Sequence, residues 1–335
     1  MRLAIGVFAL ACAAWAGTVD ELIDSVRGGL QAKRPDAEIA AIINQAGLTE
    51  RLDDAAIEAL ESDGVGPQTI EALERQRELS QTLPSPHEPL KFFDAPPAPA
   101  DADQKRVLGA ALQIAMRYTA DLPNFICTET ISRYSDAHKT QFWKLRDTLT
   151  VDVAFSEKGE RYRLVAVNHK PTTKNLSHAG GFHSNGEFGS ILQQVFGPES
   201  ATAFSWERWT MLRSRLMYVF SYRIDQPHSK YTLNLGSFFK HYKATTGMKG
   251  LVFIDRETNR VFRLSAEADG LPRDWPVLRT SGVLDYEFAD VNGQKFLLPR
   301  RVDTRVILKA EQVRNVTEFA DYRRFSSEAT ITFEK

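Results

Sequence analysis

Alternation of apolar and polar residues dominates the second half of the chain. From about residue 148 onward, apolar side chains recur at every second position in one stretch after another. The clearest stretches hold Leu149, Val151, Val153 and Phe155; Leu216, Tyr218, Phe220, Tyr222 and Ile224; Leu284, Tyr286 and Phe288; and Ala329, Ile331 and Phe333. A period of two predicts strands with one apolar and one polar face. Such strands form antiparallel sheets with one solvated side.

One hairpin is predicted with particular clarity. Leu251–Ile254 is apolar at every position, the turn-forming run Arg256–Asn259 follows, and Val261–Leu264 continues as a second strand. Turn residues between β-branched and aromatic runs are typical of a hairpin. We expect this hairpin near the centre of the sheet.

Two stretches switch to helical spacing. Gln104–Ala120 carries apolar residues on one side, and a second stretch from Phe188 to Phe196 follows Ser184–Glu187, which has the spacing of a capping box. Gly197 and Pro198 stop the second helix. Two helices next to one sheet predict the α+β class. We expect a curved antiparallel β-sheet, a half-barrel, capped by helices and preceded by a small all-α module.

The N-terminal third has a different organisation. Residues 18–79 show short amphipathic helices, with Pro35, Gly47, Gly64 and Pro67 as start and stop signals. Prolines then recur between Leu83 and Asp103, which favours an extended linker. The predicted domains are a signal peptide at 1–16, a helical module at 17–82, a proline-rich linker at 83–103 and the half-barrel domain at 104–335.

The first sixteen residues are typical of a secretory signal peptide. Arg2 precedes the apolar run Leu3–Ala14, and Ala14-Trp15-Ala16 is a small-x-small cleavage site before Gly17. Lipidation at Cys12 is an alternative, although Ala9-Leu10-Ala11 is a poor lipobox. No later apolar stretch approaches the roughly 20 residues that cross a bilayer. We expect an exported, periplasmic protein without a transmembrane segment in its mature chain; outer-membrane association is the alternative location.

Composition narrows the classes of partner. The formal net charge is -1 and no Lys/Arg-rich run is present, which argues against nucleic-acid binding. The chain has two cysteines, and Cys12 leaves with the signal peptide, so Cys127 cannot form an internal disulfide. Its neighbours Phe125 and Ile126 favour a buried structural role over a catalytic one.

Catalytic motifs are absent from the sequence. It contains no Gly-x-Ser-x-Gly elbow, phosphate-binding loop or dinucleotide fingerprint. A metal site built from His169, His178, His183 and Glu187 is conceivable, but a glycine-rich connector is the simpler interpretation. A run with Trp206, Arg208, Trp209, Arg213 and Arg215 could stack on a sugar or an anionic headgroup, or form a solvated strand face. We therefore expect no catalytic residue, no metal and no cofactor, unless two carboxylates converge in one cleft.

Some of these features resemble a known family. Gly250–Asp255 with Thr258, Val261 and Arg263, followed by Leu297-Leu298-Pro299 on a later strand, is similar to the LolA/LolB-type periplasmic carriers. The resemblance covers roughly residues 105–335. It implies a curved sheet closed by helices around an interior for the acyl chains of lipoproteins. The helical module and the proline linker are departures from the plain carrier.

The sequence thus favours a non-enzymatic protein that binds a hydrophobic ligand or a lipidated protein. The ligand would lie between the sheet and a lid helix. The candidate cavity residues are Phe188, Ile191, Leu192, Val195, Tyr218, Phe220, Tyr222, Phe253, Tyr286 and Phe288. The alternative is an envelope interaction module with a filled core, in which residues 17–82 bind a protein partner.

Overall fold

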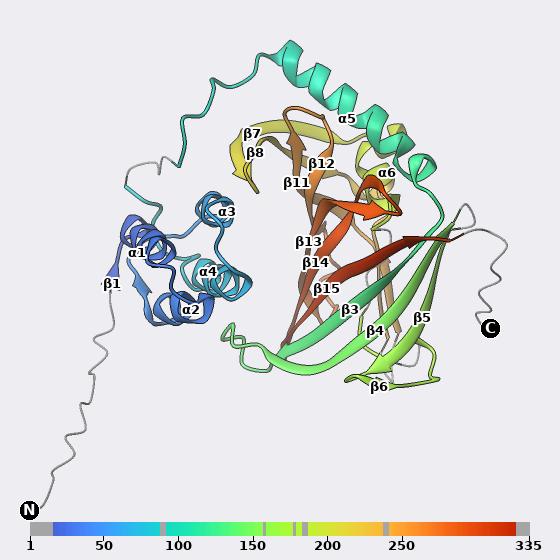
Figure 1. The fold of residues 1–335 in the computed structure, drawn as a ribbon, viewed down its shortest axis with the longest axis horizontal. Helices are drawn as coiled ribbons and strands as arrows, with labels where there is room; N and C mark the ends of the chain where they lie inside the picture. The colour runs from blue at the N-terminus through green and yellow to red at the C-terminus, as the bar shows by residue number, and fades with distance from the viewer. Residues whose placement is uncertain are drawn as a thin grey trace, which may run out of the picture. The chain divides into compact units, whose positions relative to one another are not determined.

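The computed structural model describes residues 16–87, 92–156, 159–176, 179–182, 187–236 and 241–325 (Figure 1). The chain forms two compact units, Met1–Pro96 with Thr210–Leu216 and Pro97–Trp209 with Met217–Lys335. The predicted signal peptide, apart from Ala16, and the predicted strand at Ala329–Phe333 lie outside the described residues.

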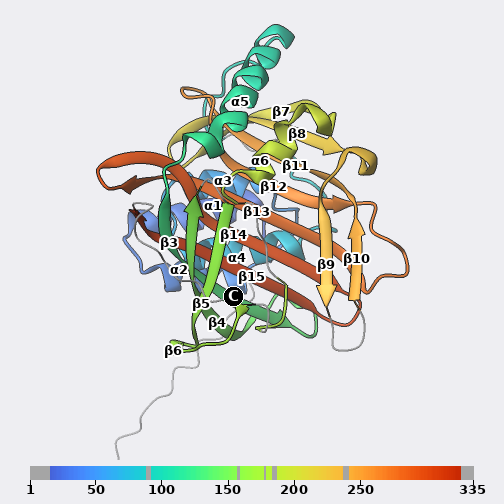
Figure 2. The same cartoon turned by 90° about the vertical axis from the view of Figure 1, so that its right-hand side faces the viewer.

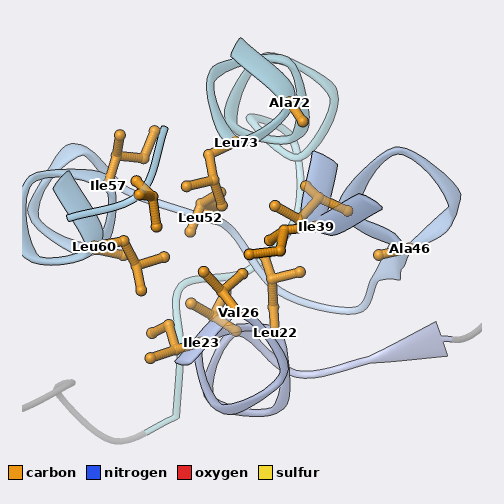
Figure 3. Close-up of a cluster of buried hydrophobic side chains, with 14 of the residues drawn as sticks. Leu22, Ile23, Val26, Ile39, Ala46, Leu52, Ile57, Leu60, Ala72 and Leu73 are labelled. Carbon is orange, nitrogen blue, oxygen red and sulfur yellow. The ribbon is translucent and has the colours of Figure 1, made fainter. Parts of the chain in front are cut away.

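The first unit contains four short helices around a small core. They are α1 (Val19–Gln31), α2 (Asp36–Gln45), α3 (Asp54–Ser62) and α4 (Pro67–Leu79), with a two-residue parallel pairing of β1 (Ala16–Gly17) and β2 (Gly47–Leu48). Thr18 and Glu21 form a capping box at the start of α1, and Asp53 caps α3. Leu22, Leu60 and Leu73 point into the core from three of the helices (Figure 3). The helices predicted for residues 18–79 are thus present.

An antiparallel sheet of eleven strands dominates the second unit. Its order is β6-β5-β4-β3-β15-β14-β13-β12-β11-β8-β7, and the sheet is open, with β6 and β7 at its edges. The strands are β3 (Phe125–Asp136), β4 (Lys144–Ser156), β5 (Gly159–Val167), β6 (Lys170–Pro171), β7 (Ala203–Leu212), β8 (Arg215–Ile224), β11 (Gly247–Asp255), β12 (Val261–Asp269), β13 (Val277–Val291), β14 (Gln294–Leu308) and β15 (Gln312–Arg324). The α+β class and the curved antiparallel sheet are confirmed.

The predicted hairpin is present but is not central. β11 and β12 pair across the turn between Asp255 and Arg260, as expected. They lie close to the β7 edge, however, and β14 is the central strand. The cause is a long-range pairing: β3 binds β15, with Glu129 opposite Phe319, and so attaches the early strands to the last one. Local sequence pattern carries no information on such a pairing.

Helices and a second hairpin cover one face of the sheet, which we call the inner face. It carries Val302, Thr304 and Val306 of β14 and their partners on the neighbouring strands. The covering elements are α5 (Asp101–Asp121), α6 (Ser190–Phe196) and the hairpin of β9 (Thr232–Gly236) and β10 (His241–Thr245) (Figure 2). A hydrogen bond from the Tyr118 hydroxyl of α5 to the Leu297 carbonyl, 2.8 Å long, fixes α5 to the sheet.

The lid helix is shorter than its spacing predicts. It begins at Ser190, after Gly189, rather than directly behind the proposed capping box, of which Ser184 lies outside the described residues. Phe188 therefore precedes α6, in a turn. None of the helices in the described part of the chain combines the length and apolar character needed to cross a membrane.

An ion cluster lies on the opposite, outer face of β14 and β15. Asp303 is 5% exposed and accepts hydrogen bonds from Arg314, whose Nε lies 2.9 Å from one carboxylate oxygen. Arg301 and Arg305 lie 3.0 and 3.5 Å away. Burial opposes ionisation of Asp303, but the three guanidinium groups outweigh it and hold the pKa of this carboxyl well below its usual range. The cluster fixes the register of two central strands.

Replacing this carboxylate tests its role. We expect Asp303→Asn to lower the free energy of unfolding by about 3–5 kcal/mol, because it leaves Arg314 buried without its counter-charge. Urea unfolding at neutral pH measures the change. Since the folded pKa lies below the unfolded one, the stabilisation by Asp303 should be lost only as the pH falls through that depressed pKa. Asp103→Asn is the control: its partner Arg106 is exposed, and a change below about 0.5 kcal/mol is expected. Equal effects of the two substitutions would contradict the assignment.

Candidate functional site

A cavity of about 1180 Å³ lies between the inner face and the elements that cover it. Its walls come from β12, β13 and β14, from the ends of β4 and β5, from α5 and α6, and from β9–β10 (Figure 2). All these residues belong to the second unit. The volume exceeds the roughly 300–1,000 Å³ of ordinary small-molecule sites.

Small and branched side chains on the sheet make this space. Ala266 of β12 pairs with Gly282 of β13, which in turn pairs with Thr304 of β14. A Cβ on Gly282 would meet its nearest neighbour, the Thr304 hydroxyl, at 3.7 Å, so the space above it is open. Leu264 and Val306 complete the apolar surface. The sheet side of the cavity is therefore mainly apolar, with the hydroxyls of Thr280 and Thr304 as its polar groups.

An aromatic cluster closes the side near β3 and β4. Phe188 is 1% exposed, and its ring centroid lies 5.3 Å from Phe125, 5.9 Å from Phe155 and 5.6 Å from Phe319. These partners come from β3, β4 and β15, so Phe188 fixes the turn before α6 to three strands. The Tyr286 hydroxyl donates to the Glu187 carbonyl at 3.0 Å and holds the same turn to β13.

The inner face is filled over β7 and β8. Trp206, Trp209, Tyr218 and Phe220 pack edge-on or tilted, with centroids 4.4–6.2 Å apart. This packing accounts for Trp206 and Trp209, for which we had considered stacking on a sugar or headgroup. Phe196 of α6 stacks on Phe204, at 5.4 Å. One end of the inner face is thus a solid core and the other a cavity.

The ten predicted cavity residues separate into groups. Phe188 and Ile191 line the cavity. Six others are buried on the inner-face side of the sheet but do not line the cavity: Leu192, Val195, Tyr218, Phe220, Tyr222 and Tyr286. Phe288 is 38% exposed and borders a separate hollow of about 360 Å³ at the ends of β13, β14 and β15.

Phe253 needs a correction, because it lies on the outer face. It pairs with Arg263, whose neighbour Leu264 lines the cavity; alternation along β12 places 263 and 264 on opposite sides. The Arg263 guanidinium lies 5.9 Å from the Phe253 ring centre. Val252, the neighbour of Phe253, has its side chain on the inner face.

Acidic residues in and next to the cavity were not among the predicted site residues. Glu160 of β5 and Glu187 before α6 line it, and Glu129 lies on the inner face of β3. The Tyr162 hydroxyl donates to Glu160. A signal was present in the sequence: Glu129 takes an inward position in the alternation Phe125, Cys127, Glu129, Ile131. A carboxyl there is unusual for a buried strand face.

Glu129 is the most perturbed acid of this group. It is 6% exposed, and burial, followed by the charges of Glu187 and Glu160, raises its pKa to about 8. Cys127, two residues before it, is buried, and burial raises the pKa of its thiol above the ordinary value of 9.0, which fits the predicted structural role. Thiolate chemistry is therefore disfavoured there.

The predicted histidine cluster is not testable, because His178 and His183 lie outside the described residues. Within the ranges that the structure describes, no group of three or more His, Cys, Asp or Glu side chains is arranged to hold a metal ion.

Comparison with known proteins gives loose matches among solved structures, and they include the following two. No protein-family model and no curated protein matches the chain. It is similar to a "putative outer membrane lipoprotein-sorting protein domain" from Vibrio parahaemolyticus, with 12% identity over 66% of this chain and 94% of that one, at a TM-score of 0.35. It is also similar to a DUF1329 family protein from Desulfovibrio piger, with 10% identity over 68% of this chain and 97% of that one, at a TM-score of 0.31.

At these TM-scores the backbones superpose too loosely for the likeness to decide a function. The sheet-and-helix architecture expected from the sequence resemblance is the one described above.

Gly189 is the residue on which the closure of the cavity by α5 and α6 depends. Its φ is +126°, and a Cβ would collide with the Thr119 hydroxyl and lie 3.0 Å from the Tyr118 ring. We expect Gly189→Ala to lower the free energy of unfolding by about 1–3 kcal/mol. Gly109→Ala, on the exposed side of α5 with no atom within 4 Å, should be neutral or stabilising. Thermal unfolding of both variants measures this, and equal melting temperatures would contradict it.

The raised pKa of Glu129 leads us to expect an unusual dependence of the free energy of unfolding on pH. The folded chain keeps this proton up to about pH 8, whereas the unfolded chain loses it near the ordinary value of 4.5. Stability should therefore fall as the pH rises between these values. Because each pKa unit corresponds to about 1.4 kcal/mol, Glu129→Gln should be several kcal/mol more stable than the parent at about pH 9 and similar to it at about pH 4.5.

Urea unfolding across this pH range checks the difference. Glu318→Gln, on the exposed outer side of β15, is the matched control and should follow the parent. A Glu129→Gln profile parallel to that of the parent would show that this carboxyl is ordinary in the folded chain.

Proposed function

We propose that this chain is an exported binding protein that holds a hydrophobic ligand, an acyl chain or the lipid of a lipoprotein, in the cavity beneath α6. The observation that supports the proposal is the hollow of about 1180 Å³ over an apolar sheet surface. Export is inferred from the three-part N-terminal segment. The periplasm is the proposed location.

The energetics favour an extended apolar ligand. Each buried methylene contributes about 0.8 kcal/mol, so a chain of about ten gains roughly 8 kcal/mol. That gain is comparable to the about 4–15 kcal/mol lost when two molecules associate. Ala266, Gly282 and Val306 offer such a chain an apolar surface, beside which the hydroxyls of Thr280 and Thr304 also line the cavity.

The cover over the cavity is suited to opening. α6 has seven residues, and near the β9–β10 hairpin the Gln194 side-chain oxygen accepts hydrogen bonds from the backbone amides of Lys230 and Tyr231, at 3.0 and 2.8 Å. Gly180 and Gly181, before the turn with Phe188, both have positive φ. We propose that α6 moves about its fixed end at Phe188 to admit the ligand.

The interaction-module alternative requires a filled interior. The inner face is filled over β7 and β8, but not over β12 to β14, and this favours the binding protein. Partner binding by residues 17–82 remains a separate proposal, because a ligand-binding cavity in one unit does not conflict with a docking role for the other.

An enzyme is the second candidate, because Glu160 and Glu187 line one cavity. Glu129 keeps its proton near neutral pH, as a general acid does, and paired carboxyls are the machinery of glycosidases. Against this, the Tyr162 hydroxyl already donates a hydrogen bond to Glu160. The wall that the sheet contributes to the cavity is mainly apolar. Hydrolysis of aryl glycosides that disappears in Glu129→Gln would favour the enzyme.

Blocking the cavity tests the proposed function. The purified chain should bind the neutral probe N-phenyl-1-naphthylamine saturably, with increased fluorescence. Gly282→Phe places a ring in the hollow and should weaken binding by about tenfold or more, since about 1.4 kcal/mol of lost contact suffices. Leu278→Phe on the same strand, 54% exposed, should bind like the parent. Absence of saturable binding by the parent would refute the proposal.

A further inference from the structure

Exposed apolar side chains gather in the turn that joins β3 to β4 (Figure 1). Among the described residues, Phe142 is the most exposed large hydrophobic side chain, at 63%, and Leu145 at the start of β4 is 51% exposed. Trp143 lies between them and is half-buried. Single exposed apolar residues are ordinary, but a run of them flanked by polar residues is typical of an interaction surface. We call residues 137–146 the β3–β4 tip.

The backbone of the β3–β4 tip has a fixed conformation. The Asp136 carboxylate accepts hydrogen bonds from the backbone amides of His138, at 3.1 Å, and Gln141, at 2.7 Å. The side chain of Gln312 donates to the same carboxylate at 2.8 Å and so fixes the turn to β15. Phe142 directly follows this network. The turn therefore presents the ring of Phe142 without a large loss of conformational entropy on binding.

The β3–β4 tip is also basic. It contains Lys139, Lys144 and Arg146 and no Asp or Glu, whereas the whole chain has a formal net charge of -1. All three basic side chains are exposed. The acid that follows the tip, Asp147, is paired with Arg133 at 2.6 Å. Positive charge therefore lies beside the exposed apolar groups.

This combination matches the surface of an anionic lipid bilayer. Aromatic side chains favour the boundary between headgroups and acyl chains, where their apolar surface leaves water. Lysine and arginine next to them are attracted by anionic headgroups. A nucleic acid would engage the cations but would leave Leu145 in water, and a protein partner would require a recess shaped for Phe142. The bilayer accepts both kinds of side chain without a recess.

We infer that the β3–β4 tip docks the protein on the surface of an anionic lipid bilayer, with Phe142 and Leu145 in the interfacial layer. The three basic side chains of the tip then lie among the lipid headgroups. None of the residues of the tip lines the cavity, so docking is independent of the ligand that the cavity binds.

Co-sedimentation with vesicles measures the docking. Vesicles of equimolar phosphatidylglycerol and phosphatidylcholine are compared with vesicles of phosphatidylcholine alone. We expect the purified chain to bind the anionic vesicles at least about tenfold more strongly, because three cations contribute to the attraction. Binding should fall as salt is added, since ions screen exposed charges. Gly282→Phe, which blocks the cavity, should sediment like the parent, and this result separates docking from uptake of lipid into the cavity.

Substitutions in the tip assign the docking to its residues. Phe142→Ser should weaken binding to the anionic vesicles by about tenfold or more, since it removes a large apolar group from the interface. Lys144→Glu should weaken binding by about the same factor and reduce its salt dependence. The controls are Leu79→Ser in α4, at a side chain that is 50% exposed, and Lys295→Glu, at the opposite end of the sheet; both should bind like the parent. Because all four side chains are exposed, each variant should keep the melting temperature of the parent.

Trp143 reports whether the tip enters the bilayer. Lipids brominated on their acyl chains quench the fluorescence of a tryptophan that lies next to them. Trp206 and Trp209 pack over β7 and β8, and Trp275 is buried. We therefore expect brominated anionic vesicles to quench the parent, and most of this quenching to disappear in Trp143→Phe.

Four results would overturn the inference. The first two are equal sedimentation with both kinds of vesicle, or sedimentation with neither, and the third is a Phe142→Ser variant that binds like the parent. The fourth is elution as a dimer that Phe142→Ser converts to a monomer, which would assign the tip to a second copy of the chain. The proposed function stands in each case, because probe binding to the cavity is measured without vesicles.

Discussion

The need to cover the inner face of an eleven-stranded sheet governs the second unit. A sheet with one apolar face must bury it against another layer, and within the described residues α5, α6 and a short hairpin form that layer. Seven residues of α6 cannot fill the width of several strands. The aromatic cluster around Trp206 and Phe220 fills one end. Over Gly282 and Ala266, where the sheet bears almost no side-chain volume, a hollow remains.

Two of the buried acidic groups of this sheet, Asp303 and Glu129, differ in how their charge is balanced. Asp303 on the outer face is surrounded by three arginines, which depress its pKa and keep it ionised. Glu129 on the inner face has its pKa raised by burial and then by the charges of Glu187 and Glu160. The ion cluster around Asp303 links β14 to β15 through the hydrogen bonds from Arg314. The second group, Glu129, lowers stability as the pH rises above the ordinary pKa of a carboxyl.

Period-two alternation was sufficient to predict the sheet, and helical spacing at 104–120 and 188–196 added the covering helices and so the class of fold. It could not place Phe253, because Leu251–Ile254 is apolar throughout and alternation then assigns no face. Its pairing with Arg263 settles the matter, and pairing is a tertiary property. Phe188 lines the cavity, and its anchoring to three strands depends on residues more than 30 positions away. Whether an interior is hollow likewise depends on distant small residues, and no local pattern predicts it. Glu129 was detectable as a carboxyl out of place in an apolar alternation.

The pairing of β3 with β15 has a consequence for how the molecule forms. Glu129 and Phe319 face each other although nearly the whole second unit separates them along the chain. The sheet cannot become continuous until β15 has been synthesised. Until then, the edge of β3 that later pairs with β15 has no partner strand. Contacts this distant slow folding, because loop closure precedes any stabilisation from them. The nascent chain therefore exposes strand edges for longer than one built from neighbouring hairpins alone, and its C-terminal strand determines when folding is completed.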